Sequence, residues 1–161
     1  MQAKKVILIC LQIVGFTIVQ SRSIEENVIQ NPITKVKQTY RFDQLPNDGS
    51  YSIRIKKLSA NIDIAGKSSS EAKLTIVKSS VTPLSVKDIK KAHSFGKIDV
   101  IYHEDDESIY IGKNEEDTTR YQFIYSIKLD IPEYIDLNFQ IEGGDIRLRN
   151  IKGETRLETG G

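Results

Sequence analysis

The residue types that could carry out chemistry are sparse in this chain and gather around its two histidines. His103 is followed at once by the acidic run EDDE at residues 104–107. Imidazole and carboxylate groups are ordinary ligands for zinc or manganese, so a metal site is one interpretation of this run. Four consecutive acids on a turn cannot all face one ion, and His93 lies at no ligand spacing from His103. We therefore expect a solvated acidic turn and assign no metal ligand.

Motifs for nucleophilic catalysis and for phosphate binding are missing from the sequence. The only cysteine, Cys10, lies in an apolar N-terminal run, and no serine stands in a G-x-S-x-G motif. The GGD run at residues 143–145 is followed by no P-loop lysine. Asp and Glu number 22, so carboxylate pairs at glycosidase-like separations would arise by chance. We predict that the protein is not an enzyme and that it has no catalytic residue and no cofactor.

Residues 1–23 have the layout of a secretory signal peptide. Two lysines precede an apolar run at residues 6–19, and the small residues Ser21 and Ser23 fit a cleavage site directly after residue 23. A membrane anchor is the alternative, but the run is shorter than the ~20 apolar residues of a spanning helix. We therefore expect export to the periplasm, the outer-membrane surface or the extracellular space, with no stable membrane span after cleavage.

The remaining chain is long enough for one domain. Removal of 23 of the 161 residues leaves 138, without cysteine, so the fold has to bury its own core rather than rely on disulfides. Lys and Arg number 23 and Asp and Glu 22, and the leader removes three cations, which leaves 20 against 22. This balance favours neither nucleic acid nor an anionic membrane surface as a partner. These properties fit a bacterial envelope or surface protein.

Period-two alternation of apolar and polar residues dominates residues 37–161 and predicts a mainly β domain. The longest alternating run, RYQFIYSIKLDIP, spans residues 120–132 and ends at a proline, which cannot donate to a strand ladder. Tyr121, Phe123 and Tyr125 share one face of this run, and we expect them to belong to the core. Residues 24–36 are polar with scattered aliphatic residues, and we expect them to form an irregular lead-in.

One segment has helical spacing instead. In PLSVKDIKKAHSFG, residues 83–96, Ser85 stands three residues before Asp88 in the arrangement of a capping box. Gly96 can end a helix. We predict one short amphipathic helix near residues 85–94.

The last twenty residues, EGGDIRLRNIKGETRLETGG, contain two short alternating runs between two Gly-Gly pairs. Such a unit of about 17 residues is the length of one β-solenoid coil, which is stable only when it is stacked on neighbours. Glycines fit the corners, where the backbone needs positive φ or close approach. The corner glycines that we predict are Gly143, Gly144, Gly153, Gly160 and Gly161.

The period of this unit is not strict. One such step back from Leu157 reaches the polar Gln140, whereas its neighbours Phe139 and Ile141 are apolar. A repeat whose coils differ slightly in length, or a transition strand before the first coil, would account for the difference in phase. An ordinary hairpin with glycine turns stays open as a further alternative.

The outward positions of this unit carry charges of both signs. The candidate exposed face consists of Asp145, Arg147, Arg149, Arg156 and Glu158. Opposite charges on neighbouring rungs of a stack stabilise it weakly. The face is either a binding surface or an ordinary solvated surface.

The C-terminal region, from IKLDIPEYIDLNFQ onward, resembles the adhesin-like domains of bacterial envelope proteins, a family of unknown function related to the head domains of autotransporter-like adhesins. Their hallmark is a strand that ends at a proline step, an apolar strand, and repeat units of the form G-D-I-x-L-x-x-I-x-G-x-x-x-L-x-T. The matching residues are Ile131, Pro132, Leu137, Gly144, Asp145, Ile146, Leu148, Ile151, Gly153, Leu157 and Thr159. The similarity extends upstream to about residue 40. It implies a short-strand β-solenoid, β-helix-like or stacked-sheet architecture over residues 37–161.

The resemblance also implies a function. The protein would be an exported, non-catalytic interaction module that presents one face to a glycan, a peptide or another envelope component. The alternative is an envelope-stress sensing or scaffolding domain that docks onto a membrane regulator. Members of the family usually carry several glycine units, so we expect either a short version of the domain or a chain that is truncated after Gly161.

Overall fold

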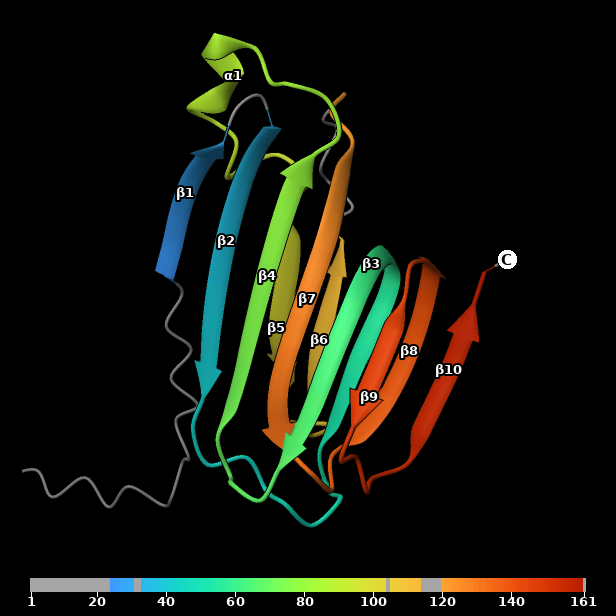
Figure 1. Ribbon diagram of the computed structural model, residues 1–161. Helices are drawn as coiled ribbons and strands as arrows, with labels where there is room; N and C mark the ends of the chain where they lie inside the picture. The colour runs from blue at the N-terminus through green and yellow to red at the C-terminus, as the bar shows by residue number, and fades with distance from the viewer. Residues whose placement is uncertain (1–23, 31–32, 104, 114–119, 161) are drawn as a thin grey trace, which may run out of the picture.

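The computed structural model describes residues 24–30, 33–103, 105–113 and 120–160. The expected signal peptide, residues 1–23, lies outside the described residues. Within them the protein is mainly β, as predicted, with ten strands and one short helix (Figure 1). The elements are β1 (Ile24–Gln30), β2 (Ile33–Phe42), β3 (Ser52–Lys67), β4 (Ala72–Ser80), α1 (Val86–Ile89), β5 (Ile98–His103), β6 (Ser108–Lys113), β7 (Phe123–Pro132), β8 (Asp136–Gly143), β9 (Ile146–Arg149) and β10 (Thr155–Thr159).

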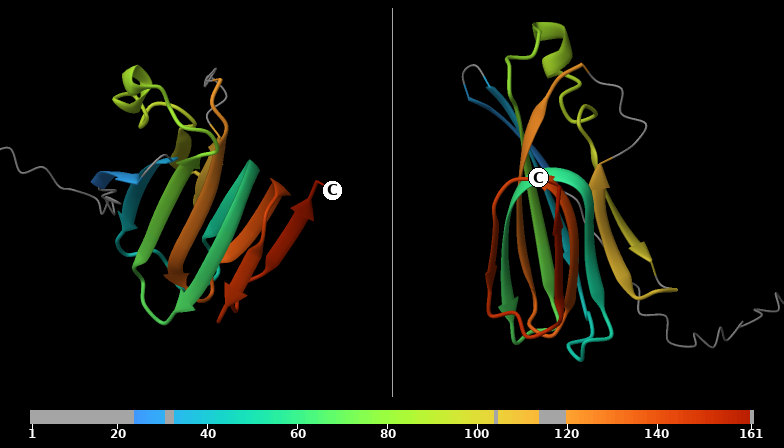
Figure 2. Two further views of the ribbon diagram at one scale, coloured as in Figure 1. Left: turned by 45° about the horizontal axis from the view of Figure 1, so that its top comes forward. Right: turned by 90° about the vertical axis from the view of Figure 1, so that its right-hand side faces the viewer.

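The strands form one curled, open sheet that folds back on itself into two facing layers (Figure 2). Layer A has the strand order β1-β2-β4-β7-β3-β9, and layer B has the order β5-β6-β3-β8-β10. Strand β3 belongs to both layers, because its first half pairs with β6 and β8 and its second half with β7 and β9. The change of layer occurs around Lys57, which has a φ of +52° and lies where the register with β8 shifts.

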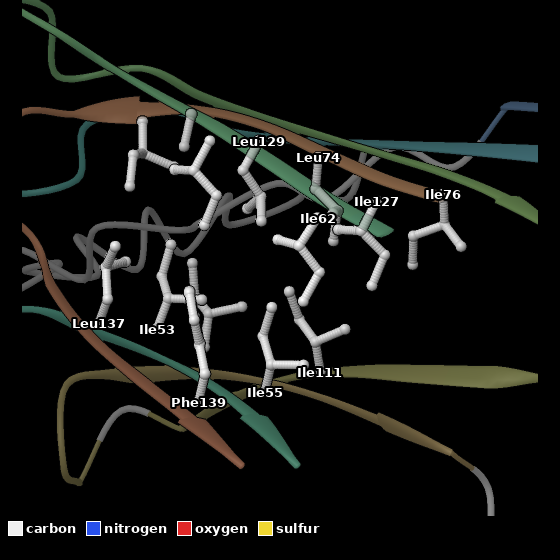
Figure 3. Packing of buried hydrophobic residues seen from close by; sticks show 14 of the residues in the cluster. Ile53, Ile55, Ile62, Leu74, Ile76, Ile111, Ile127, Leu129, Leu137 and Phe139 are labelled. Atoms are coloured by element: carbon white, nitrogen blue, oxygen red, sulfur yellow. The ribbon is translucent and has the colours of Figure 1, made fainter. Parts of the chain in front are cut away.

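The core lies between the two layers. Residues of β3 alternate between buried and more exposed positions, and Ile53 and Ile55 of its first half and Ile64 of its second half are completely buried. Figure 3 shows apolar side chains of layer A, among them Leu74 and Ile127, pointing toward those of layer B. Full burial of one such side chain stabilises the fold by roughly 2 kcal/mol. Period-two alternation therefore identified the half-buried strands correctly.

The N-terminal lead-in is a strand rather than an irregular segment. The structure forms β1 and the start of β2 within residues 24–36, and β1 pairs antiparallel with β2 from Ile24 opposite Thr39 to Gln30 opposite Ile33. An edge strand needs backbone partners on one side only, so it forms without the strict apolar alternation that a core strand shows. The expectation of an irregular lead-in failed for that reason.

The short helix is present where it was expected but ends sooner. Helix α1 covers Val86–Ile89, and the chain continues in turns as far as Gly96. The predicted capping arrangement is formed, because Ser85 Oγ accepts a 3.2 Å hydrogen bond from the backbone N–H of Asp88. No residue of the helix is buried, and a short helix that buries little apolar surface is only marginally stable.

The C-terminal unit alternates between the layers as a coil would. Strand β9 runs parallel to β3 in layer A, and β10 runs parallel to β8 in layer B. Leu157 pairs with Phe139 rather than with Gln140, so apolar residues stand opposite each other in these two strands. A solenoid is not shown, however, because β3 lies between β6 and β8 although it precedes both in the chain. The observed sheet is open and curled, and its neighbours are not successive coils.

Candidate functional site: a basic outer face of layer A

Layer A has six strands, and the described side chains of its outer face come from five of them, β2, β4, β7, β3 and β9. On β2 and β4, each residue that points outward alternates with one that points into the core. Because the strands are in register, outward residues of neighbouring strands form rows across the sheet, with adjacent side chains about 5 Å apart. One row consists of Arg41, Lys73, Asp130, Ala65 and Arg149. The next row consists of Thr39, Thr75, Lys128, Asp63 and Arg147.

This face carries a large excess of positive charge. The outward positions of its five strands hold eight cations and two carboxylates. The cations are Lys35, Lys37, Arg41, Lys67, Lys73, Lys128, Arg147 and Arg149. Both carboxylates are bound within the face, since Arg149 donates to Asp63 at 2.9 Å and Lys67 lies 3.3 Å from Asp130. On these five strands, subtraction of two from eight leaves an excess of six positive charges, which attracts anions over several ångströms of solvent. Just outside the strands, Asp43 and Glu71 lie beside Arg41 and Lys73 and lower the excess at that end of the face.

The outer face of layer B is different. Its described strand positions hold three cations, Arg54, Lys56 and Arg156, against four carboxylates on β5, β8 and β10. Arg54 is already paired with Asp106 at 2.8 Å. The chain is therefore almost neutral as a whole but strongly basic on one side. The net charge of the sequence does not reveal this asymmetry, because only the fold separates the charged strand positions into two outer faces.

The five residues of the predicted exposed face are divided between the layers. Arg147 and Arg149 lie in the basic face of layer A, and Asp145 lies at the corner before β9, where its N–H donates to Asn61 Oδ1 at 3.1 Å. Arg156 and Glu158 lie on β10 in layer B, opposite Asn138 and Gln140 of β8. The structure does not bring the five residues onto one surface, because successive strands of this unit alternate between the layers (Figure 2).

The predicted corner glycines fall into two groups. A Cβ on Gly144 would stand 2.1 Å from the carbonyl oxygen of Ala60, and one on Gly153 would stand 2.2 Å from that of Ile135. These two positions are places where neighbouring turns approach too closely for any side chain. Gly143 and Gly160 have no such neighbour, since their nearest contacts are 4.0 and 3.9 Å away. Gly161 lies outside the described residues.

A second polar cluster joins α1 to the start of β7. The hydroxyl of Tyr121 donates to Asp88 Oδ2 at 2.6 Å, and the hydroxyl of Ser85 donates to the same oxygen at 2.6 Å. Arg120 lies 3.6 Å from that oxygen. The Ser85 hydrogen bond, followed by the Tyr121 hydrogen bond and the Arg120 charge, holds the pKa of Asp88 below its usual range. An ionised carboxylate that is held in this way acts as an anchor for the segment.

A buried lysine, Lys78, forms hydrogen bonds to the same segment. Lys78 is 2 % exposed, and its amino group donates to the carbonyl oxygens of His93, at 2.8 Å, and of Phe95. It also lies 5.7 Å from the centre of the Phe123 ring. Buried ammonium groups are tolerated only where such acceptors surround them. This lysine therefore fixes the path of the chain between α1 and β5.

The aromatic residues around the start of β7 are buried to different degrees. Tyr125 is buried and donates to the carbonyl oxygen of Gly96 at 3.0 Å. Phe123 is partly buried against the main core, and Tyr121 packs beside the smaller apolar cluster around Val36. The interpretation as core is therefore confirmed for Tyr125, whereas Tyr121 and Phe123 are half-buried and line a hollow beside it.

The two histidines and the acidic turn after His103 give no metal site among the described residues. Both His93 and His103 are exposed, and no group of three or more His, Cys, Asp or Glu side chains in that part of the chain could hold a metal ion. Glu104 lies outside the described residues. Asp106 is engaged by Ser108, whose hydrogen bond is the main cause that lowers its pKa, and by Arg54.

The fold and the basic face place the protein in a broad structural class: a mainly β protein with a curled open sheet and a basic outer surface on layer A. Comparison with protein-family models, with curated proteins and with solved structures gives no match to this chain. Within the described residues, no helix has the length and apolar character required to cross a membrane.

Proposed function

We propose that the protein is an exported, non-catalytic interaction module of the adhesin-like class, and that it binds an acidic polysaccharide through the basic outer face of layer A. The single observation that supports this function is the excess of cations over carboxylates on that face. The signal-peptide layout of residues 1–23 supports export.

The geometry of the face suits an extended polyanion better than a small ligand. Neighbouring strands of a sheet lie about 4.8 Å apart, so the cations stand at regular intervals across β2, β4, β7, β3 and β9. A linear polymer with a charge on each repeat can contact several of them at once. Individual contacts of this kind are weak in water, but their sum is effective and depends strongly on salt.

A stacked-coil architecture is the finer form of the proposal. The two halves of β3 lie first in layer B and then in layer A, and β8, β9 and β10 alternate between the same two layers. Strand β10 lies beside β8 in continuous register, from Thr155 opposite Leu137 to Thr159 opposite Ile141. This regularity supports a short solenoid-like arrangement in which each coil adds a strand to both layers. The rigid stack would hold the cations of layer A in fixed positions.

Binding to model polymers tests the function. The chain without residues 1–23, which retains every described strand, is titrated with heparin as an acidic probe and with dextran as its neutral counterpart. We expect binding to heparin only, and a loss of about tenfold or more in affinity between roughly 50 and 300 mM NaCl. Binding to single-stranded DNA but not to heparin would contradict the polysaccharide assignment.

A matched pair of variants locates the binding surface. Replacement of Lys73, Lys128 and Arg147 by glutamine removes three cations from layer A, and we expect affinity for heparin to fall by about tenfold or more. Replacement of Lys56, Lys90 and Lys113 removes three cations elsewhere, and we expect a change of less than about threefold. Equal losses in both variants would show that binding follows net charge rather than this face.

A further inference from the structure

Among the described strands, β10 is the outermost one of layer B, at the C-terminal side of the sheet (Figure 1). Within the described residues it pairs with β8 alone, and all five of its residues are exposed. Leu157 is 50 % exposed although it belongs to the inner row that continues from the buried Phe139. A strand in this position offers unpaired backbone groups to another strand.

The hydrogen bonds to β8 show which backbone groups face outward. The carbonyl oxygen of Glu154 accepts from Leu137 N at 2.8 Å, and Gly160 N donates to Ile141 O at 2.9 Å. The even-numbered residues of β10 therefore turn their backbone groups toward β8. Since these groups alternate along a strand, the N–H and C=O groups of Thr155, Leu157 and Thr159 point away from the sheet.

The sequence of β10 is self-complementary when it is reversed. In TRLET, Leu157 is the central residue and is flanked by Arg156 and Glu158. A threonine stands at each end of the strand. In an antiparallel pair of two such strands centred on Leu157, each arginine would stand opposite a glutamate and each threonine opposite a threonine. A parallel pair in register would instead set arginine against arginine and glutamate against glutamate, which is unfavourable.

We propose that β10 pairs antiparallel with β10 of a second copy of this chain, about a two-fold axis at Leu157. The N–H and C=O groups of Thr155, Leu157 and Thr159 point away from β8, as this pairing requires. Leu157 meets Leu157 of the partner subunit, and Thr155 meets Thr159 of the partner subunit, as hydrogen-bonded pairs. Arg156 and Glu158 of the partner subunit then form the non-hydrogen-bonded pair, in which side chains approach most closely.

The side chains of β10 are available for this arrangement. Arg156 is paired with Glu154 at 3.1 Å, but the side chains of both residues are largely exposed, at 74 % and 65 %. Exposed pairs of this kind contribute little, so Arg156 can also engage a carboxylate across the axis. The two copies of Leu157 would cover each other, and layer B would continue without interruption from one subunit into the next. This inference does not depend on the proposed polysaccharide ligand.

Charge reversal tests the pairing. The oligomeric state of the chain without residues 1–23 is measured by analytical ultracentrifugation, and we expect a dimer at micromolar concentrations. Arg156→Glu gives a strand with two glutamates, and Glu158→Arg gives one with two arginines, so each variant alone should dimerise at least tenfold more weakly. Circular dichroism checks that both variants keep the β fold, so that a loss of dimer cannot come from unfolding.

Two combinations make the test specific. An equimolar mixture of Arg156→Glu and Glu158→Arg should form a heterodimer, which native mass spectrometry separates by mass from any homodimer. The double variant Arg156→Glu/Glu158→Arg should dimerise as the original chain does, because every opposed pair again unites opposite charges. The proposal is overturned if the unsubstituted chain stays monomeric at about 0.5 mM. The edge of β10 would then be open to a different partner. It is also overturned if both single variants dimerise as strongly as the unsubstituted chain, or if their mixture forms no heterodimer.

Discussion

Gly144 lies directly against Ala60, so that a Cβ on Gly144 would stand 2.1 Å from the carbonyl oxygen of Ala60. Gly144 also has a φ of +110°, in the region that other residues rarely adopt. These two constraints coincide at the turn where the chain leaves β8 in layer B and enters β9 in layer A. The turn is therefore closed to side chains for two independent reasons.

We predict that Gly144→Ala lowers the free energy of unfolding by about 2–4 kcal/mol, because the backbone of β9 has to move away from β3. Urea denaturation measures this change. Gly143→Ala is the matched control, since its nearest neighbour would be Ser59 Oγ at 4.0 Å. It should change stability by less than about 1 kcal/mol. Similar losses in the two variants would show that the close approach to Ala60 is unimportant.

Replacement of Lys78 by methionine should loosen the segment between α1 and β5. The carbonyl oxygens of His93 and Phe95 would lose a buried donor, and the cost of such a loss is about 1–3 kcal/mol. We expect faster amide exchange at residues 84–97 and a smaller effect in β8. Unchanged exchange in this segment would contradict the anchoring role of Lys78.

Acid should weaken the anchor at Asp88. Hydrogen bonds from Ser85 and Tyr121 lower the pKa of this carboxyl in the folded state, so its contribution to stability is present above the pKa of the unfolded chain. That contribution disappears as the pH falls through the lowered pKa, below about pH 4. Asp88→Asn should therefore flatten the loss of stability in this acidic range. Thermal unfolding at several pH values measures it.

The two hydrogen bonds to Asp88 can be separated by NMR titration. Because the Ser85 hydrogen bond is the larger cause, Ser85→Ala should raise the pKa of Asp88 more than Tyr121→Phe does. Both variants should move it toward the usual range. A pKa that stays unchanged in Tyr121→Phe would show that the 2.6 Å contact is not formed in solution.

Strand β10 should exchange its amide hydrogens faster than β7 in a monomeric variant such as Arg156→Glu. Strand β7 lies between β4 and β3, whereas β10 has only β8 beside it among the described strands. Amides that lack a second neighbouring strand open by local fraying. Equal protection of both strands in the monomeric variant would contradict this order of stability.

The sequence predicted the strands well because their burial follows a simple period. Residues 120–132 alternate along their length, and the buried positions of β7 include Tyr125, Ile127 and Leu129 as that pattern requires. The capping pair Ser85 and Asp88 was equally visible, because its partners lie three residues apart. Short-range patterns of this kind contain enough information to place single elements.

The arrangement of the elements was not predictable in the same way. The alternation of β3 continues through Lys57 with only one extra residue, so the pattern gives no sign that its halves belong to different layers. The basic face escaped detection for a related reason. Its cations come from five strands, and only the register between distant segments places Arg41, Lys73 and Arg149 in one row.

The position of β3 has a consequence for the order of folding during synthesis. This strand is made early, but the strands that flank it, β6 and β8 in layer B and β7 and β9 in layer A, are all made after residue 107. Pairing between such distant segments closes slowly, because large loops have to be ordered first. Both layers around β3 therefore stay incomplete until most of the chain has been translated, although β1, β2 and β4 can pair earlier.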